Sequence, residues 1–258
     1  MSAAPGGVLL DIDGVLTTSW REIPGAAATV EEIRRRGIPF RLLTNTTTHT
    51  RTELARTLAE ASISVEPEEI VTAVVGAAAY LRETHPGARC FLLSDGDATE
   101  DLEGVLLVED EPDVVVIGGA SEDFSYSNVD RVFRMLVDGA SLVAMHRNLY
   151  WRASDGLRLD SGAYVRGLEE AAGEEAAIVG KPAETFFRAA LDEIGVAPER
   201  ALMVGDDVEN DVRGAQRIGM TGVLVRTGKF RERDLDGDEL PAHVIGSIAD
   251  LPALFDAS

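Results

Sequence analysis

Four polar segments of this chain combine residue types that can carry out chemistry. Each follows a short apolar run, which is the pattern of a buried strand that ends in functional groups. The first offers two carboxylates one residue apart, the second a hydroxyl and an amide, the third an ammonium, and the fourth the carboxylates of three aspartates. The segments are 11–14 (DIDG), 44–45 (TN), 180–182 (GKP) and 205–211 (GDDVEND).

Each segment alone has an ordinary structural explanation. An Asp-Gly pair after a strand is often only a turn, hydroxyls before a helix can cap it, and acidic residues at a helix start complement the helix dipole. The combination is harder to explain structurally, because it unites a nucleophilic carboxylate, anion-binding groups and carboxylates that need a cation. Lys181 is also one of only two lysines, with Lys229, among 24 basic residues. We therefore predict one site built from all four segments.

The elements that must position these groups alternate between strands and helices. This pattern predicts an α/β fold with a parallel sheet covered on both faces, in which ligands bind at the carboxyl ends of the strands. Two further segments with apolar residues, 244–245 and 248–254, come last in the sequence. Predicted strands are 8–10, 40–44, 69–72, 89–94, 114–118, 142–146, 178–179, 201–204 and 222–225, and predicted helices are 29–36, 51–61, 75–83, 129–137, 165–172, 183–194 and 211–218.

Composition limits the possible partners and surroundings. The 258 residues are enough for one large or two modest domains. A net charge of −21 repels nucleic acid and anionic membranes, so we expect neither as a partner. The single cysteine, Cys90, excludes an intramolecular disulfide. The sequence has neither a signal-peptide pattern nor a long apolar run, so we expect a cytoplasmic location.

The order DxDG, TN, GKP, GDDxxxD resembles the four-motif signature of the haloacid dehalogenase-like hydrolase superfamily. The stretches 214–220 (GAQRIGM) and 227–230 (TGKF) are similar to its type IIA subfamily. The resemblance runs over nearly the whole chain. It implies a Rossmann-like parallel-sheet core made from both ends of the chain, with an inserted α/β cap of the C2 type. We therefore expect residues 1–74 and 178–258 to form the core and residues 75–177 to form the cap.

The resemblance implies phosphoryl transfer through an aspartyl-phosphate. Asp11 would attack phosphorus, and Asp13 would protonate the leaving oxygen and then activate water. Asp13 argues against a dehalogenase, because a halide leaving group needs no proton. Phosphomutases usually carry another cap type. A module that holds phosphate on Asp11 without turnover is a further alternative, although receiver domains are shorter and need no acid/base at position 13.

The resemblance also implies Mg²⁺ as the cofactor, with the carboxylates as its ligands. It places the metal on the Asp11 carboxylate, the backbone carbonyl of Asp13 and Asp206. Asp207 or Asp211 would act through water or from a second layer of ligands. A few carboxylates with waters and phosphate are the ligands that Mg²⁺ prefers.

Phosphate binding and substrate choice involve a different group of residues. By resemblance, Thr44, the backbone of Asn45 and Lys181 would bind the non-bridging phosphate oxygens. The cap stretch 145–164 would contact the substrate, which we expect to be a small phosphate ester. Many type IIA proteins have an Asn-Pro-Asp-like stretch where this chain has HRN, so the resemblance does not identify the substrate. A homodimer is a possible assembly that the sequence does not decide. The candidate cap residues, which could instead belong to a surface hairpin, are His146, Arg147, Asn148, Tyr150 and Trp151.

Overall fold

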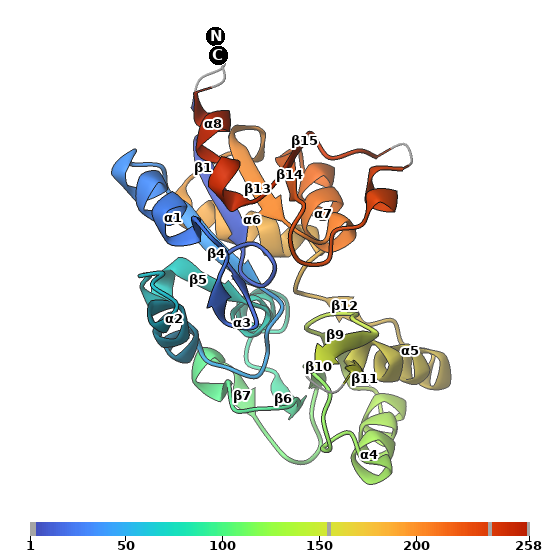
Figure 1. Ribbon diagram of the computed structural model, residues 1–258. Coiled ribbons are helices and arrows are strands. Elements are labelled where there is room, and N and C mark those ends of the chain that lie inside the picture. The colour runs from blue at the N-terminus through green and yellow to red at the C-terminus, as the bar shows by residue number, and fades with distance from the viewer. Residues whose placement is uncertain (1–3, 154–155, 237–238, 257–258) are drawn as a thin grey trace. The chain divides into compact units, whose positions relative to one another are not determined.

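The computed structural model describes residues 4–153, 156–236 and 239–256. They form two compact units, which Figure 1 traces along the chain. Unit 1 consists of Met1–Thr44, Arg51–Val71 and Lys181–Ser258, and unit 2 consists of Asn45–Thr50 and Thr72–Gly180. The segment 75–177 lies wholly within unit 2, and its role as a cap stays a prediction.

Unit 1 is built on a six-stranded sheet in the order β15-β14-β13-β1-β4-β5. The central pairings, from β4 through β1 and β13 to β15, are parallel. All five residues of β1 are buried, as expected for a parallel strand that is covered on both faces. The strands are β1 (Gly7–Asp11), β4 (Phe40–Thr44), β5 (Ile70–Thr72), β13 (Ala201–Gly205), β14 (Thr221–Val225) and β15 (His243–Ile245).

Helices cover both faces of this sheet. Leu10 packs on one face in a cluster with Ile33 and Phe255. Gly7 points to the other face, where an added Cβ would lie 2.9 Å from Ile194 Cδ1. The helices are α1 (Ala26–Arg35), α2 (Arg51–Glu60), α6 (Glu184–Ile194), a π-helix (Val208–Arg213), α7 (Gly214–Arg217) and α8 (Pro252–Phe255). The unit also contains 3₁₀ turns at Pro67–Glu69, Pro198–Arg200, Glu232–Leu235 and Ile248–Asp250.

A small hairpin that the sequence did not predict follows β1 in unit 1. Its strands are β2 (Thr17–Thr18) and β3 (Arg21–Glu22). Both turn residues, Ser19 and Trp20, have positive φ values of 50° and 60°. This is the requirement of a type I′ turn, which is usually met by Asn or Gly. The hairpin was missed because its strands are too short for periodicity and its turn lacks those residues.

Unit 2 is built on a second parallel sheet, in the order β12-β9-β8-β6-β7. Alternate residues of β8 enter two cores, with Val115 and Ile117 in one and Val114 and Val116 in the other. The strands are β6 (Arg89–Leu93), β7 (Leu106–Leu107), β8 (Val114–Ile117), β9 (Ser141–Ala144) and β12 (Ala177–Ile178), with the separate hairpin β10 (Tyr150–Ala153) and β11 (Gly156–Leu159). The helices are α3 (Ala73–Thr84), α4 (Tyr126–Val137), α5 (Ser161–Ala172) and the 3₁₀ turn Thr99–Asp101.

The predicted α/β class with parallel sheets is confirmed. Besides the short strands β2, β3 and β7, which were not predicted, the differences lie at element ends. The strand predicted to reach His146 ends at Ala144. The helix predicted to start at Asp211 starts at Val208 and is π-helical up to Arg213. Such wide turns are frequent at functional sites. Among the described residues, no helix is long and apolar enough to cross a membrane.

Candidate active site

The strand ends of unit 1 bring the predicted carboxylates together. Asp11 is the last residue of β1, and Gly205 is the last residue of β13. Because β1 and β13 are parallel and aligned, Asp206 follows at the same edge of the sheet as Asp11. Thr44 ends β4 at this edge, where its neighbour Leu43 lies opposite Asp11. This is the edge at which ligands bind in open parallel sheets.

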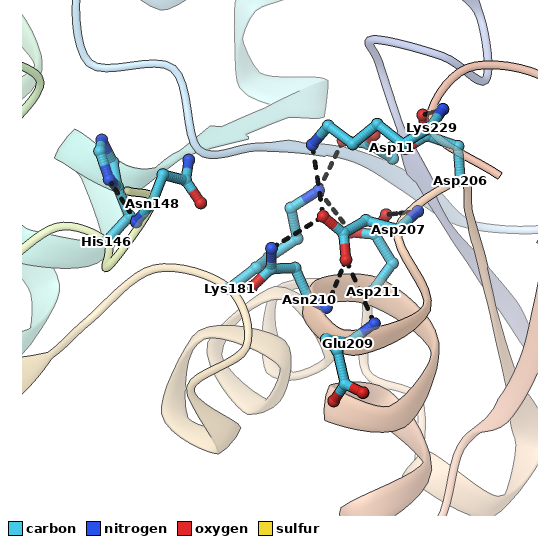
Figure 2. Close-up of polar contacts among 10 residues, drawn as sticks. All are labelled: Asp11, His146, Asn148, Lys181, Asp206, Asp207, Glu209, Asn210, Asp211 and Lys229. Atoms are coloured by element: carbon cyan, nitrogen blue, oxygen red, sulfur yellow. Dashed lines mark hydrogen bonds and ion pairs between the residues drawn. The ribbon is translucent and has the colours of Figure 1, made fainter. Parts of the chain in front are cut away.

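Lys181 joins two of the carboxylates. Its Nζ lies 2.5 Å from Asp11 Oδ1 and 2.6 Å from Asp211 Oδ1 (Figure 2). All three side chains are buried. Burial alone would lower the pKa of Lys181, but Asp11 and Asp211 outweigh it and raise that pKa above the usual lysine value. Lys181 therefore stays an ammonium at neutral pH and offsets part of the negative charge around it.

Asp206 is held through only one of its two oxygens. Oδ2 accepts a hydrogen bond of 2.7 Å from the backbone N–H of Lys229. Oδ1 is buried and accepts no hydrogen bond from any residue that the structure describes. Burial, together with the charges of Asp11 and Asp211, raises the pKa of Asp206 to about 8. A buried oxygen left without a donor is costly unless something else satisfies it.

Asp211 lies closer to Asp11 than a second layer of ligands would suggest. Its carboxylate pairs with Lys181 and also accepts a 3.2 Å hydrogen bond from the backbone N–H of Asp207. Gly205 allows this approach, because an added Cβ there would lie 2.2 Å from Asp211 Cβ. Burial raises the pKa of Asp211 to about 6, with Lys181 acting in the opposite direction.

Asp207 acts mainly as a cap. Its Oδ1 accepts hydrogen bonds from the backbone N–H groups of Glu209 and Asn210 at the start of the π-helix (Figure 2). Its Oδ2 accepts from the Asn210 side chain and lies 3.4 Å from Lys229 Nζ. Burial alone would raise the pKa of Asp207, but Lys229 and the Asn210 donors outweigh it and lower that pKa. Asp207 thus orients the loop that carries Asp206 and Asp211.

The donor set fits a divalent cation. One carboxylate oxygen each from Asp11, Asp206 and Asp211 lies within 4.8 Å of the others. Three buried carboxylates against the single ammonium of Lys181 leave excess negative charge in a site with little water. Oδ1 of Asp206 is also without a protein donor among the described residues. Hard oxygen ligands of this kind are those that Mg²⁺ and related cations take.

Asp13 differs from the other carboxylates because its side chain is exposed. Partial loss of hydration raises the pKa of its carboxyl above the ordinary value, against the opposing charges of Lys229 and Lys181. Gly14 comes next, with a φ of 89° that favours glycine. An added Cβ at this position would lie only 2.0 Å from Asp206 Oδ2. Gly14 is therefore needed for the close approach of Asp206.

The two predicted phosphate-binding residues next to β4 are adjacent in sequence but fall in different units. Thr44 is buried at the end of β4 in unit 1. Asn45 belongs to unit 2, where its Oδ1 would lie 2.7 Å from a Cβ added at Gly180. Gly180 immediately precedes Lys181, so Asn45 packs against the segment that leads to the ammonium. Their role toward phosphate stays a prediction.

The candidate substrate residues of unit 2 differ in exposure and partners. His146 is buried, and burial lowers the pKa of its imidazole although Asp160 opposes this. Arg147 forms two hydrogen bonds, of 2.9 and 2.5 Å, with the carboxylate of Glu169. The backbone N–H of Asn148 donates to His146 Nδ1 at 3.4 Å (Figure 2).

The two aromatic candidates lie on the β10–β11 hairpin. A surface hairpin was the alternative that the sequence left open for this stretch. Tyr150 and Trp151 are exposed. They are consecutive residues of β10 and so point to opposite faces of the hairpin. Ser154 and Asp155, which belong to the same predicted stretch, lie outside the described residues. Contact of any of these side chains with substrate stays a prediction.

Sequence reasoning missed the structural role of the segment 227–229. The Thr227 hydroxyl donates a 2.5 Å hydrogen bond to the backbone carbonyl of Gly14. The Lys229 backbone holds Asp206, and its side chain lies near Asp207. The sequence feature that could have indicated this role is Lys229, the second of only two lysines, which follows a predicted strand and a glycine.

Comparisons with known proteins agree with this geometry. The family model described as haloacid dehalogenase-like hydrolase matches residues 8–111, and a HAD-hydrolase-like model matches residues 178–251. The chain is 40% identical over 227 residues to haloacid dehalogenase-like hydrolase domain-containing protein 2 of Rattus norvegicus, covering 88% of this chain and 86% of the relative.

A second relative and a solved structure carry names that state an activity. The chain is 39% identical over 242 residues to phospholysine phosphohistidine inorganic pyrophosphate phosphatase of Xenopus laevis, covering 91% of this chain and 88% of the relative. The fold superposes on p-nitrophenyl phosphatase from Archaeoglobus fulgidus with a TM-score of 0.89 and 26% identity, covering 97% and 99% of the two chains.

Proposed function

This chain belongs to the haloacid dehalogenase-like hydrolase family, and on that premise we propose that it is a Mg²⁺-dependent phosphatase of small phosphomonoesters that works through an aspartyl-phosphate on Asp11. The observation that carries the proposal is the buried contact between the ammonium of Lys181 and Asp11, next to Asp206 and Asp211. The names of the Xenopus relative and the Archaeoglobus structure both state a phosphatase, and the second names a phosphate ester as substrate, which supports hydrolytic phosphoryl transfer.

In the first step, a carboxylate oxygen of Asp11 attacks phosphorus. Lys181 holds Oδ1, so we assign the attack to Oδ2. The bond between phosphorus and the ester oxygen breaks, and Asp13 gives its proton to that oxygen. The raised pKa of Asp13 supports this role, because the carboxyl then keeps its proton to a higher pH than an ordinary aspartic acid does.

In the second step, Asp13 takes a proton from water and the resulting hydroxide attacks phosphorus. The bond from phosphorus to the Asp11 oxygen breaks, which frees phosphate and the Asp11 carboxylate. Asp13 is protonated again and ready for the next substrate. The exposure of Asp13 supports this step, because water and the leaving alcohol must reach its carboxyl.

The proposal assigns the metal to the negatively charged groups of the site and the phosphoryl oxygens to its positively charged and hydrogen-bonding groups. Asp11, Asp206 and the Asp13 backbone carbonyl would hold Mg²⁺, with Asp211 close enough to contribute directly or through water. When bound, the metal supplies positive charge that neutralises the phosphoryl oxygens. Lys181, Thr44 and the Asn45 backbone are assigned to the same oxygens, whose charge spreads in the transition state.

Unit 2 is assigned the role of a cap that chooses the substrate. Among the candidate side chains, Tyr150 and Trp151 are exposed, while His146 and Arg147 already have partners within their own unit. The two aromatic residues are therefore the ones we assign first to substrate contact. A covered site favours small phosphate esters over phosphoproteins.

Turnover of p-nitrophenyl phosphate, with Mg²⁺ and with EDTA, tests the proposed function. We expect release of p-nitrophenol that needs the metal and is lost in Asp11→Asn, which keeps the shape of the side chain but not its charge. Full activity of Asp11→Asn would refute the role of Asp11. A stable phosphoprotein without turnover would favour the signalling alternative.

A further inference from the structure

The segment Thr227–Lys229 contacts two of the catalytic loops within unit 1. It follows β14, next to β13 in the sheet, and reaches both the turn after Asp13 and the carboxylate of Asp206. Each of its three residues makes a different kind of contact there. None of the four family motifs includes this segment.

Thr227 holds the turn that follows the nucleophile. Its Oγ1 donates a hydrogen bond of 2.5 Å to the backbone carbonyl of Gly14. The backbone N–H of Gly14 in turn donates to the carbonyl of Thr17 at 2.7 Å. Both polar groups of the Gly14 peptide backbone are therefore bonded, and the position of Asp13 is restricted from its C-terminal side.

Gly228 supplies the space in which Asp206 and the turn meet. A Cβ added at Gly228 would lie 1.9 Å from Asp206 Oδ2 and 2.7 Å from Gly14 Cα. Both distances are well below van der Waals contact. Its φ of 64° also lies in the left-handed region that favours glycine.

Lys229 orients Asp206 through its backbone and not through its side chain. Its N–H donates to Oδ2 at 2.7 Å, which fixes the plane of the carboxylate. Oδ1 is then the oxygen left without a donor from the described residues. The Lys229 side chain is largely exposed, and its Nζ lies 3.4 Å from Asp207 Oδ2.

We propose that Thr227–Lys229 is a positioning segment, which turns Asp206 so that Oδ1 faces the cation and fixes the turn that carries Asp13. This inference rests on the proposed function and extends it to a segment outside the four motifs. Its three residues touch no reacting atom and act through Asp206 and Gly14. A displacement of Asp206 should therefore weaken metal binding even when no substrate is present.

Gly228→Ala, compared with Gly195→Ala, is the test of this proposal. Gly195 is in the same unit, has a similar φ of 66°, and has no atom within 4 Å of an added Cβ. Both variants carry a similar backbone strain, so both should lose thermal stability, and Gly228→Ala should lose more because its Cβ also meets Asp206 and Gly14. Only Gly228→Ala pushes on Asp206, so only this variant should bind Mg²⁺ at least tenfold more weakly in calorimetry without substrate.

The rate of substrate turnover is the second measurement on Gly228→Ala and Gly195→Ala. We expect kcat for p-nitrophenyl phosphate to fall at least a hundredfold in Gly228→Ala and to stay within threefold of wild type in Gly195→Ala. Thr227→Val should lower kcat at least tenfold, and Thr227→Ser, which keeps the hydroxyl, should restore most of it. Mg²⁺ affinity and kcat in Gly228→Ala equal to those of Gly195→Ala would overturn the proposal.

The same two measurements on the wild-type protein distinguish a failure of this proposal from a failure of the proposed function. If wild type turned over substrate without Mg²⁺, the metal part of the proposed function would fail, and kcat of the glycine pair would still decide the role of the segment. If wild type bound Mg²⁺ without turnover, calorimetry would decide it. A wild type that does neither would overturn both proposals.

Discussion

Replacing Lys181 by Met should destabilise unit 1 strongly, because it removes the counter-ion of two buried carboxylates. Nζ lies 2.5 and 2.6 Å from Asp11 and Asp211, and the three side chains are no more than 9% exposed. Breaking a buried ion pair by removing one partner costs about 3–5 kcal/mol, since the charge left behind stays desolvated. That is a large part of the roughly 5–15 kcal/mol that keeps a protein folded.

The other lysine of the chain is the matched control. Lys229 pairs with Asp207 at 3.4 Å, but its side chain is 62% exposed. Exposed pairs contribute about 1 kcal/mol or less, so Lys229→Met should change the stability little. The two substitutions are chemically identical and differ in the burial of the lysine and in the number of carboxylates it contacts, so the difference between their effects measures the buried contacts.

Urea unfolding in EDTA, followed by tryptophan fluorescence, gives the free energies. The chain has two tryptophans, and a Trp151→Phe background leaves Trp20, which lies in unit 1, as the reporter. With a typical slope of about 2–3 kcal/mol per molar urea, Lys181→Met should lower the midpoint by about 1–2.5 M. Equal midpoints for Lys181→Met and Lys229→Met would refute the buried ion pair.

Three further predictions follow from the carboxylates. Because the folded protein raises the pKa of Asp206 to about 8 and of Asp211 to about 6, it binds protons more tightly than the unfolded chain. The stability of the metal-free protein should therefore fall as the pH rises from about 4 to about 8, and a melting temperature in EDTA that rises over this range would contradict it. Protons compete with the cation for the same oxygens, so Mg²⁺ affinity measured by calorimetry should fall as the pH is lowered, by about tenfold for each pH unit below about 8 if one proton is displaced. An affinity that does not change between pH 6 and pH 8 would argue against binding at these groups. Above about pH 8, where Asp206 is ionised, Asp206→Asn removes a buried like charge, so it should raise the melting temperature in EDTA and abolish the further rise with Mg²⁺; an undiminished response to Mg²⁺ would place the metal elsewhere.

The sequence was sufficient to predict that the residues of the candidate site lie together, because their signals are local. Asp11, Lys181 and Asp206 each follow a strongly apolar strand, and parallel strands carry their ends to one edge of a sheet. The buried contact of Lys181 with Asp11 could be anticipated from charge, because clustered carboxylates need a cation nearby. The family resemblance then assigned roles that spacing alone does not supply.

The rest depends on tertiary contacts that leave little mark on the chain. The contact of Asp211 with Lys181 was not predicted, because it depends on the wide π-helical turn and on the missing side chain of Gly205. The place of Asp211 in a second layer of metal ligands stays a prediction. The role of Gly228 depends on the position of Asp206, which is 22 residues away in the sequence. His146 was expected to end a strand and contact substrate, and its burial in unit 2 is set by packing that no local pattern records.

The central claim is that Asp11 carries the phosphoryl group between the two chemical steps. Its most direct test is to mix Asp13→Asn with p-nitrophenyl phosphate and Mg²⁺, quench in acid within seconds, and locate the phosphoryl group by peptide mass spectrometry. Without the base for the second step, the phosphorylated enzyme should accumulate, with the modification on Asp11. Absence of phosphorylated Asp11, together with turnover in Asp11→Asn, would contradict the proposed mechanism.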